Sequence, residues 1–265
     1  MILPQTLTAV FRFLTKSLAI AGMEVRKLRH DPTELATRAV QPILWLMVFG
    51  QVLAHVRGIP TGSLSYIDFL APGILAQSVL FVAIFYGISI IWERDLGIVH
   101  KFLISPTPRT ALVLGKAASA GARALSQAVI IYLLALALGV KMNWSPGALA
   151  GVFLLVMLGA ALFSTFSLII ACIVKTRERF MGIGQVLTMP LFFASNAIYP
   201  TTIMPEWLRQ IAHLNPLSYE VDGLRALMLA GGASGFGLGL DFAVLTVVLV
   251  LLVIIGGWIY PRIVT

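Results

Sequence analysis

Six long apolar stretches constrain this chain more than any other feature of its sequence. A helix that crosses the hydrocarbon core of a bilayer needs about 20 mostly apolar residues in a row. Hydrophobic residues make up 59% of the 265 residues and charged residues only 11%, whereas an ordinary soluble domain is about a quarter charged. Because one core cannot bury so much apolar surface, lipid must surround much of the chain. The predicted spans are about Ala36–Ala54, Pro72–Trp92, Ala118–Leu138, Gly147–Val174, Phe180–Tyr199 and Phe242–Tyr260.

The distribution of Lys and Arg predicts the orientation of these spans. Segments on the side of the N-terminus hold fourteen of these residues, whereas the alternating segments hold only Arg57, Lys141, Arg209 and Arg225. Since Lys and Arg concentrate in cytoplasmic loops, both termini are expected in the cytoplasm of a prokaryotic cell, and segment 196–229 outside. The opening "MILPQTLTAVFRFLTK" lacks the pattern of a removable signal peptide. No linker or repeat divides the chain, which predicts one all-helical membrane domain over residues 1–265, with a six-span bundle over 36–260.

A cationic amphipathic helix is expected before the first span, over residues 12–30. One face of that helix would be apolar and the charges would lie elsewhere, which suits a helix lying in the inner membrane interface. The alternative is a plain basic segment that binds lipid headgroups. In "DPTE", Asp31 is the expected N-cap, Pro32 the first helical residue and Glu34 part of a capping box. The apolar face would hold Leu14, Leu18, Ala21, Val25 and Leu28.

Groups that carry chemistry are scarce in this sequence. No predicted span has an Asp or Glu near its centre, which disfavours a proton- or sodium-coupled carrier. The four histidines lie outside the spans, Cys172 lies within an apolar run, and no hydrolase, metal-binding or phosphate-loop motif occurs. We therefore expect no enzyme activity and no cofactor in this chain. The net charge of +8 is explained by anionic lipid rather than by nucleic acid.

Arg123 is the one candidate charge inside a predicted span, and Gln127 shares its helical face. It could line a substrate path. The favoured alternative is that the membrane begins near Ala120 and that Arg123 extends its guanidinium to the inner membrane surface.

The segment Glu93–Lys116, between the second and third predicted spans, contains a second amphipathic pattern. Apolar residues at helical spacing, from Leu96 to Leu103, are followed by Pro106 and Pro108, which cannot continue a helix. A short helix of this kind suits docking in a groove of another protein. The alternative, a helix lying in the lipid headgroups, is equally compatible with the sequence.

Two separated motifs resemble one known family. "FLAPGILAQSVLFVAIFYGISIIWERDLGIVHKFLISPTPRTALVLGK" is similar to the membrane subunits of ABC exporters of the type-2 permease family, particularly the daunorubicin-resistance permeases. "MPEWLRQIAHLNPLSY" followed by "VDGLRALML" resembles the closing signature of that family. The resemblance implies two six-span permeases side by side, as a homodimer or a heterodimer. It also implies a cytoplasmic ATPase dimer that binds ATP and Mg²⁺ in place of this chain.

The resemblance also assigns roles to residues. The helix Leu96–Ser105 would couple to the ATPase, together with the end of the N-terminal helix, and an outward insert over Pro200–Pro216 would form two short re-entrant helices. Its apolar residues at helical spacing argue for re-entry rather than for an exposed loop. The coupling residues would be Val25, Leu28, Leu96, Val99, Lys101, Phe102 and Leu103. The insert would be marked by Pro200, Pro205, Trp207, Leu208, Ile211, Leu214 and Pro216.

These observations predict the permease subunit of an ATP-driven exporter of amphipathic drugs or lipids, of the multidrug-resistance kind, in the inner membrane. Polysaccharide or lipo-oligosaccharide export is the alternative within the family, and a secondary carrier, a channel or a lipid-modifying enzyme lies outside it. A few polar residues in apolar surroundings could line the cargo path, or could simply pack helices together. They are Gln77, Ser78, Ser126, Gln127 and Asn196.

Overall fold

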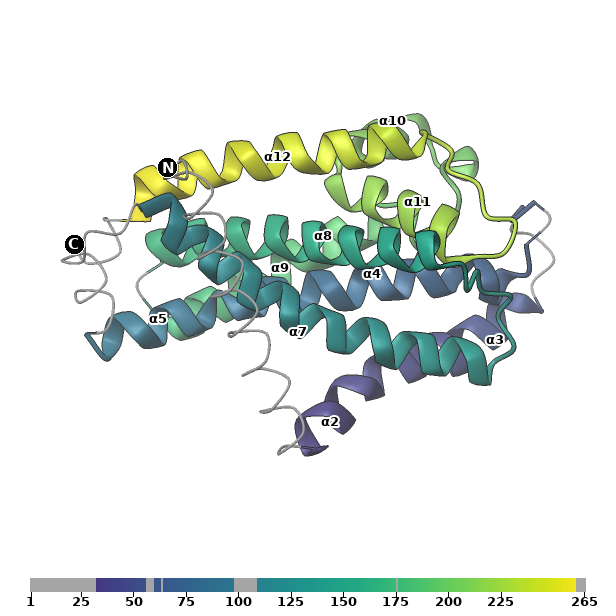
Figure 1. The fold of residues 1–265 in the computed structure, drawn as a ribbon, viewed down its shortest axis with the longest axis horizontal. Helices are drawn as coiled ribbons and strands as arrows, with labels where there is room; N and C mark the ends of the chain where they lie inside the picture. Colours follow the sequence, from purple (N-terminus) through teal and green to yellow (C-terminus); the bar gives the residue numbers. More distant parts are fainter. Residues whose placement is uncertain (1–31, 56–59, 63, 98–108, 175, 261–265) are drawn as a thin grey trace, which may run out of the picture.

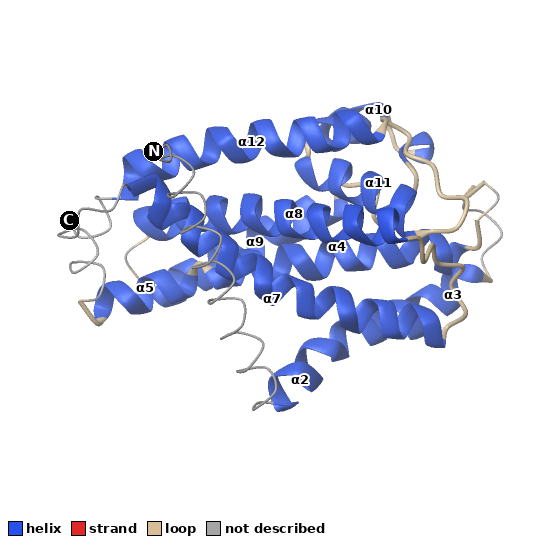
Figure 2. Cartoon of the chain, viewed as in Figure 1, coloured by secondary structure: helices blue, strands red, loops and turns tan. Residues whose placement is uncertain are grey.

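The computed structural model describes residues 32–55, 60–62, 64–97, 109–174 and 176–260. These residues are almost entirely helical (Figures 1 and 2), and the β-structure among them is an isolated antiparallel bridge between Met142 and Leu229. The elements are α2 (Pro32–Ile43), the π-helix η1 (Leu44–Phe49), α3 (Gly50–Ala54), α4 (Tyr66–Tyr86), α5 (Ile88–Asp95), α7 (Arg109–Ala137), α8 (Pro146–Ile173), α9 (Arg177–Phe193), the 3-10 helix η2 (Thr201–Ile203), α10 (Glu206–Leu214), α11 (Pro216–Met228) and α12 (Leu238–Ile259).

Four described segments are long and apolar enough to cross a membrane. They are Tyr66–Asp95, which joins α4 to α5, and Leu112–Ala137, Pro146–Ile173 and Leu238–Ile259. They correspond to the second, third, fourth and sixth predicted spans. The first predicted span appears as α2, η1 and α3 in succession, and the fifth as α9, which has only 17 residues. Six spans therefore remain a prediction.

The first predicted span is not a regular α-helix. Its helix begins at Pro32, as "DPTE" predicts, because the missing N–H of proline costs nothing at a helix start. Pro42 lies inside α2 and is followed at once by the π-helix Leu44–Phe49. A proline in a helix interior removes a backbone hydrogen bond and clashes with the preceding turn, which is consistent with the change in helical pitch at this point.

Helix α4 lies at the centre of the bundle. Most of its side chains are buried, and it packs against α7, α8 and α11. A helix that is apolar all round belongs in an interior. It begins earlier than the sequence predicted, because Ser65 caps it by accepting a hydrogen bond from Asp68 N at 3.1 Å. Pro72, the predicted start, lies within the helix.

The long helices run side by side, and two different ends of the bundle result (Figure 1). Helices α10, α11 and α3 lie at one end, and α5 lies at the other. Helix α12 lies at the edge, where most of its surface is exposed, as expected for a helix facing lipid. We call the two ends the α11 end and the α5 end.

A short link fastens α11 to the connection between α7 and α8. Asn143 N donates to Met228 O at 2.8 Å, and Ala230 N donates to Lys141 O at 2.8 Å. These bonds flank the bridge between Met142 and Leu229. Two connections far apart in sequence are therefore held together at the α11 end.

Candidate functional site

Helix α11 brings a cluster of polar side chains into an otherwise apolar bundle. Asn215 caps this helix by accepting a hydrogen bond from Leu217 N at 3.0 Å, and Pro216 follows as its first residue. The helix packs against α4, α8 and α12, so that polar residues on all its faces become buried. The buried polar cluster consists of Asn196, Glu220, Asp222, Arg225 and Asp241, and the half-buried Ser234 joins it through hydrogen bonds to Asp222 and Asp241.

Arg225 joins three segments at the centre of this cluster. Its Nη2 donates to Asn196 O at 2.8 Å and to Phe69 O at 3.4 Å, and its guanidinium lies 3.8 Å from the centre of the Phe69 ring. Asp222, one turn earlier on α11, is close enough to attract the guanidinium electrostatically. A buried guanidinium needs such partners because burial removes its hydration.

The irregular turn after α9 obtains its hydrogen bonds from side chains of other elements. Asn215 Nδ2 donates to Leu191 O at 2.7 Å and to Ala194 O at 3.1 Å, and Tyr66 Oη donates to Ile198 O at 3.0 Å. Arg225 supplies the donor for Asn196 O. Lipid offers no donors, so non-helical backbone at membrane depth persists only where protein satisfies it.

Asp222 and Asp241 both contact one serine. Ser234 Oγ lies 2.7 Å from Asp222 Oδ2 and 3.0 Å from Asp241 Oδ2, and it accepts a hydrogen bond from Gly237 N at 2.6 Å. Asp222 Oδ2 also accepts from Phe236 N at 2.9 Å. The loop between α11 and α12 is therefore bonded to both helices.

Glu220 is fully buried against α8. A Cβ placed on Gly159 would lie 2.3 Å from the Glu220 carboxylate, so only glycine leaves room for it. Neither carboxylate oxygen has a hydrogen-bond partner among the described residues. An isolated ionised carboxylate would be very costly in such surroundings, which indicates that Glu220 is neutral in this conformation.

The α5 end carries charges at its surface rather than in its interior. Asp95 pairs with Arg177 at 2.8 Å and with Arg94 at 3.0 Å, and the Arg177 guanidinium lies 3.8 Å from the centre of the Trp92 ring. Glu93 pairs with Lys116 of α7. These contacts join the ends of α5, α7 and α9 immediately before the predicted coupling segment.

Most of the predicted coupling residues lie outside the described residues. This holds for Val25, Leu28, Val99, Lys101, Phe102 and Leu103. Leu96 is described: it is the C-cap of α5, is 68% exposed and precedes Gly97, whose φ is +69°. A positive φ is readily adopted only by glycine, so α5 ends here and Leu96 lies in a turn.

The predicted insert forms short helices at the α11 end. Pro205 and Pro216 stand at the starts of α10 and α11, Pro200 precedes η2, and none of the three interrupts a helix. Trp207, Ile211 and Leu214 are 64%, 47% and 84% exposed. Glu206 and Arg209 form an ion pair on another side of α10. The amphipathic character predicted for this helix is present, and none of the described residues covers its apolar face.

An apolar pocket lies between α10 and α9. It has a volume of ≈ 680 Å³, and Asn215 and Tyr199 are the polar residues in its lining. Leu208, Ile211 and Leu214 line it from α10, and Leu187 and Phe193 line it from α9.

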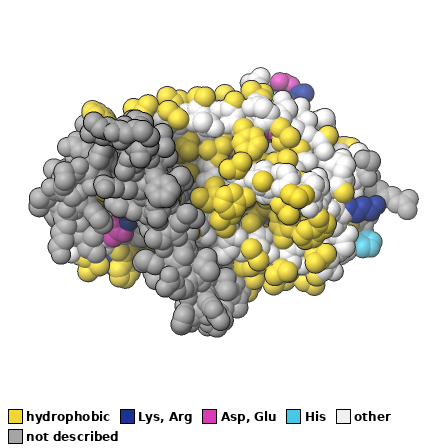
Figure 3. All heavy atoms as spheres, viewed as in Figure 1, with side chains coloured by type: hydrophobic (Ala, Val, Ile, Leu, Met, Phe, Trp, Pro, Cys, Tyr) yellow, Lys and Arg dark blue, Asp and Glu magenta, His cyan; other side chains and the backbone are white. Residues whose placement is uncertain are grey.

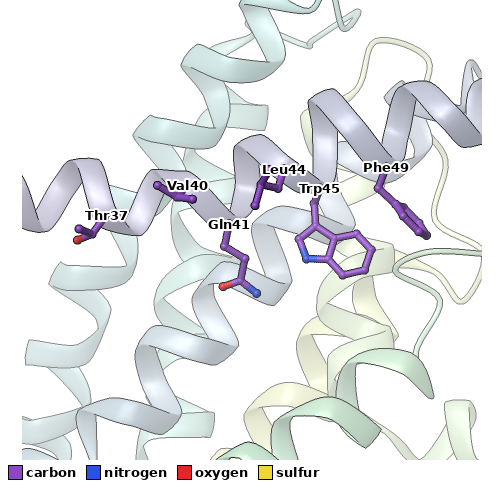
Figure 4. Close-up of a pocket in the computed structure, with 6 residues that line it drawn as sticks. All are labelled: Thr37, Val40, Gln41, Leu44, Trp45 and Phe49. Carbon is purple, nitrogen blue, oxygen red and sulfur yellow. The ribbon is translucent and has the colours of Figure 1, made fainter.

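A second pocket lies along the helices of the first predicted span, and Figure 4 shows the residues that line it. Gln41 and Trp45 project to the same side of the helix, with Phe49 one turn further on. The pocket volume is ≈ 360 Å³. In the described part of the face drawn in Figure 3, hydrophobic side chains fill the middle and charged ones lie toward the ends. This distribution is expected of a surface that faces lipid.

The predicted path residues are buried inside the single chain, except for the half-buried Ser126. Gln77 and Ser78 lie on α4, and Ser126 and Gln127 lie on α7, which packs against α4. Ser78 Oγ donates to Ile74 O at 2.9 Å and Ser126 Oγ to Arg123 O at 2.6 Å, so both hydroxyls are satisfied within their own helices. Asn196 belongs to the buried polar cluster.

Arg123 is half-buried, and its guanidinium lies 5.2 Å from the centre of the Tyr86 ring on α4. This contact is compatible with both readings of Arg123 given by the sequence.

Sequence reasoning missed the buried acidic residues of the cluster. Glu220 and Asp222 follow the predicted insert, within the segment 196–229 that was expected outside, and charges in a connection between spans usually face water. The sequence did contain a signal, because the pattern "EVDGLRALM" offers no wholly polar helical face on which its charges could all be exposed.

The described residues thus form a multi-pass helical membrane protein with a buried polar cluster at one end and uncovered apolar surfaces on its flanks. Comparison with known proteins identifies its family. The family model described as "ABC-2 type transporter" matches residues 16–229, most of the chain. The chain belongs to this family and is a transport permease.

Its relatives carry corresponding names. The transport permease ycf38 of Cyanophora paradoxa is 27% identical over 219 residues, 82% of this chain and 75% of the relative. The daunorubicin resistance ABC transporter permease protein DrrB1 of Streptomyces coeruleorubidus is 24% identical, over 78% and 72% of the two chains. The inner membrane transport permease YadH of Escherichia coli K12 is 25% identical, over 78% and 79%. Permeases of this family generally work with an ATP-binding subunit.

Proposed function

We propose that this chain is the six-span subunit of an ATP-driven exporter that moves amphipathic drugs or lipids out of a prokaryotic cell. It works beside a second permease copy and with a cytoplasmic ATPase dimer that binds ATP and Mg²⁺. The observation that carries the choice of cargo is the apolar pocket between α9 and α10, which has few polar groups in its lining.

The lengths of the shorter helices support six spans. Helices α2, η1 and α3 have 12, 6 and 5 residues, which at 1.5 Å per residue reach about 34 Å. Helix α9 reaches about 25 Å by the same measure. The turn after it, whose backbone hydrogen bonds are made by protein side chains, would cross the rest of the hydrocarbon core. A hydrocarbon core is about 30 Å thick.

The distribution of charge supports an orientation with the α5 end in the cytoplasm. Arg94, Arg109, Lys116, Arg177 and Arg179 belong to the helix ends at the α5 end, whereas Lys141, Arg209 and Arg225 belong to the α11 end, an excess of five to three among these described residues. The coupling helix between α5 and α7 then meets the ATPase, and α10 re-enters the outer leaflet.

The uncovered faces of the first and fifth spans supply a surface for the second copy. Leu44, Met47 and Val48 are about half exposed, and Val186 on α9 is 70% exposed. Apolar side chains on a single permease can face lipid tails without a free-energy cost, so the hydrophobic effect does not drive two permeases together. Close van der Waals packing of these side chains therefore stabilises the permease pair.

The pocket between α9 and α10 suits an amphipathic cargo for a physical reason. An apolar body gains dispersion contacts with Leu208, Ile211 and Phe193, and one polar group can reach Asn215 or Tyr199. An oligosaccharide would leave most of its hydroxyls without partners in the same lining, and each unpaired hydroxyl is costly to bury.

Reconstituting the permease with its ATPase in lipid nanodiscs tests the proposal. An amphipathic dye, a phospholipid and a water-soluble oligosaccharide are added in turn, and ATP hydrolysis is measured. Stimulation by the dye or the phospholipid is expected, and Ile211→Lys should abolish it, because Ile211 lines the pocket. Gln210→Lys places the same charge one residue away, outside the lining, and should retain stimulation.

Two results would overturn the proposal. Stimulation by the oligosaccharide alone would assign the transporter to sugar export. Equal stimulation in the Ile211 and Gln210 variants would remove the pocket from the cargo path.

A further inference from the structure

We propose that Asp241 holds a proton which it donates to Ser234, and that this proton locks the loop between α11 and α12 onto both helices. The loop spans residues 229–237 and lies at the α11 end, beside the helices of the insert. The proposal does not depend on the cargo or on the ATPase.

A count of the hydrogen-bond donors and acceptors at Ser234 indicates that one neighbouring carboxyl group carries a proton. A serine hydroxyl has one proton to donate and two lone pairs that accept. Gly237 N–H uses one lone pair, at 2.6 Å. Two carboxylate oxygens then remain, Asp222 Oδ2 at 2.7 Å and Asp241 Oδ2 at 3.0 Å, for one hydroxyl proton. Both contacts can be hydrogen bonds only if one of the two carboxyl groups is itself protonated.

The surroundings decide which carboxyl group carries the proton. Asp222 Oδ2 accepts a second hydrogen bond, from Phe236 N at 2.9 Å, and Asp222 attracts Arg225. Both interactions favour its ionised form. Asp241 is fully buried, and its Oδ1 has no partner among the described residues. The chain of donors therefore runs from Asp241 O–H to Ser234 O–H to the Asp222 carboxylate.

The other charged groups near the cluster do not supply a counter-charge for Asp241. Glu220 on α11 is acidic, and α8 carries no charged residue at all. The charged residues of α7, Arg109, Lys116 and Arg123, lie in its first half, away from the α11 end. His213 of α10 contacts Phe236 through its ring, 5.3 Å between centres, and the backbone N–H of Lys141 donates to Asp68 of α4 at 3.4 Å. Arg225 attracts Asp222, but its hydrogen bonds go to Asn196 O and Phe69 O rather than to Asp241.

Loss of the proton would act on the loop. With Asp241 ionised, Ser234 could serve only one carboxylate, and the two carboxylates, both in contact with one oxygen, would repel. Helix α11 packs closely on Asp241 of α12, since a Cβ added at Gly223 would lie only 3.5 Å from the Asp241 side chain. Repulsion between Asp222 and Asp241 would therefore also push α11 away from α12. Alkaline conditions on the α11 side would then loosen that end of the permease.

Infrared spectroscopy of the purified full chain tests for the proton directly. A protonated carboxylic acid has a carbonyl stretching band separate from that of a carboxylate. As the pH is raised from about 5 to about 9, well above the ordinary range of a carboxyl group, the wild type should lose the band of one acid. Asp241→Asn should lack this change, and Glu220→Gln, which removes the other buried acid, should keep it. The absence of a change in the wild type, or its persistence in Asp241→Asn, would refute the proposal.

Thermal unfolding over the same pH range tests for the lock. In the Asp241→Asn variant the amide N–H can still donate to Ser234, so the unfolding midpoint of this variant should not change with pH. The unfolding midpoint of the wild type should fall by about 2–8 °C as the pH rises. Ser234→Ala should be as unstable at acidic pH as the wild type is at alkaline pH. If Asp241→Asn is less stable than the wild type at every pH, Asp241 is ionised and the lock does not exist.

Discussion

Replacing Gly73 by Ala tests the close approach between α4 and the turn after α9. A Cβ on Gly73 would lie 2.3 Å from Ala197 O and 2.9 Å from Ala197 C. The obstructing atoms are backbone atoms, and they belong to the turn that Arg225 and Tyr66 hold in place. The turn must therefore move by about 1 Å to restore a normal van der Waals contact.

Two opposing effects determine the size of the change. Ala is favoured over Gly in a helix interior by about 1 kcal/mol, whereas overpacking costs about 1–3 kcal/mol and sometimes more. Because the turn is anchored, the upper part of that range applies, and the net loss should be about 2 kcal/mol. Such a loss lowers the unfolding midpoint of a chain this size by about 4–8 °C.

The matched control is Gly115→Ala in α7. No described atom lies within 4 Å of a Cβ at Gly115, so the same replacement should cause no clash and should leave stability unchanged or slightly raised. Both variants are measured by thermal unfolding of the purified chain in one detergent. If Gly73→Ala unfolds at or above the midpoint of Gly115→Ala, the turn after α9 does not lie against α4 as described.

Three further predictions concern orientation, coupling and the buried cluster. A cysteine replacing Glu206 should react with an impermeant thiol reagent in intact cells and one replacing Thr107 should not; the opposite pattern would reverse the proposed orientation. Phe102→Asp should leave membrane insertion intact but uncouple ATP hydrolysis from export, since burying an unpaired carboxylate in a partner's groove costs several kcal/mol, about 2.5–3.5 even on lenient scales; normal export would mean that this helix is not seated in a partner. Arg225→Lys should lower the unfolding midpoint although it keeps the charge, because Lys cannot stack on Phe69 and bond Asn196 O together; an unchanged midpoint would show that charge alone matters there.

The sequence located the long apolar helices, but it predicted both ends of a helix closely only for α8. The expected span Gly147–Val174 differs by one residue at each end from α8, because apolar length and the preceding Ser145 and Pro146 mark its start. The start of α4 was wrong by six residues. The apolar run that defines the predicted span begins at about Pro72, whereas "SYID" at Ser65 carries the capping pattern that starts the helix.

The buried polar cluster could not be assembled from the sequence. Its members come from the turn after α9, from α11, from the following loop and from α12, and periodicity within one helix gives no information on contacts between such segments. Gly159 illustrates the limit. Its role is to leave room for the Glu220 carboxylate, a residue 61 positions later.

The link between residues 141–143 and 228–230 has a mechanical consequence. It closes a ring of chain that runs from α8 through α9, η2 and α10 to α11, so the start of α8 and the end of α11 cannot separate without breaking backbone hydrogen bonds. The end of α9 is held within this ring, because Asn215 Nδ2 donates to Leu191 O and Ala194 O. Helix α10 packs mainly on α11 and η2, so it is the part of the ring whose displacement would break the fewest contacts, and such a displacement would change the volume of the pocket between α9 and α10.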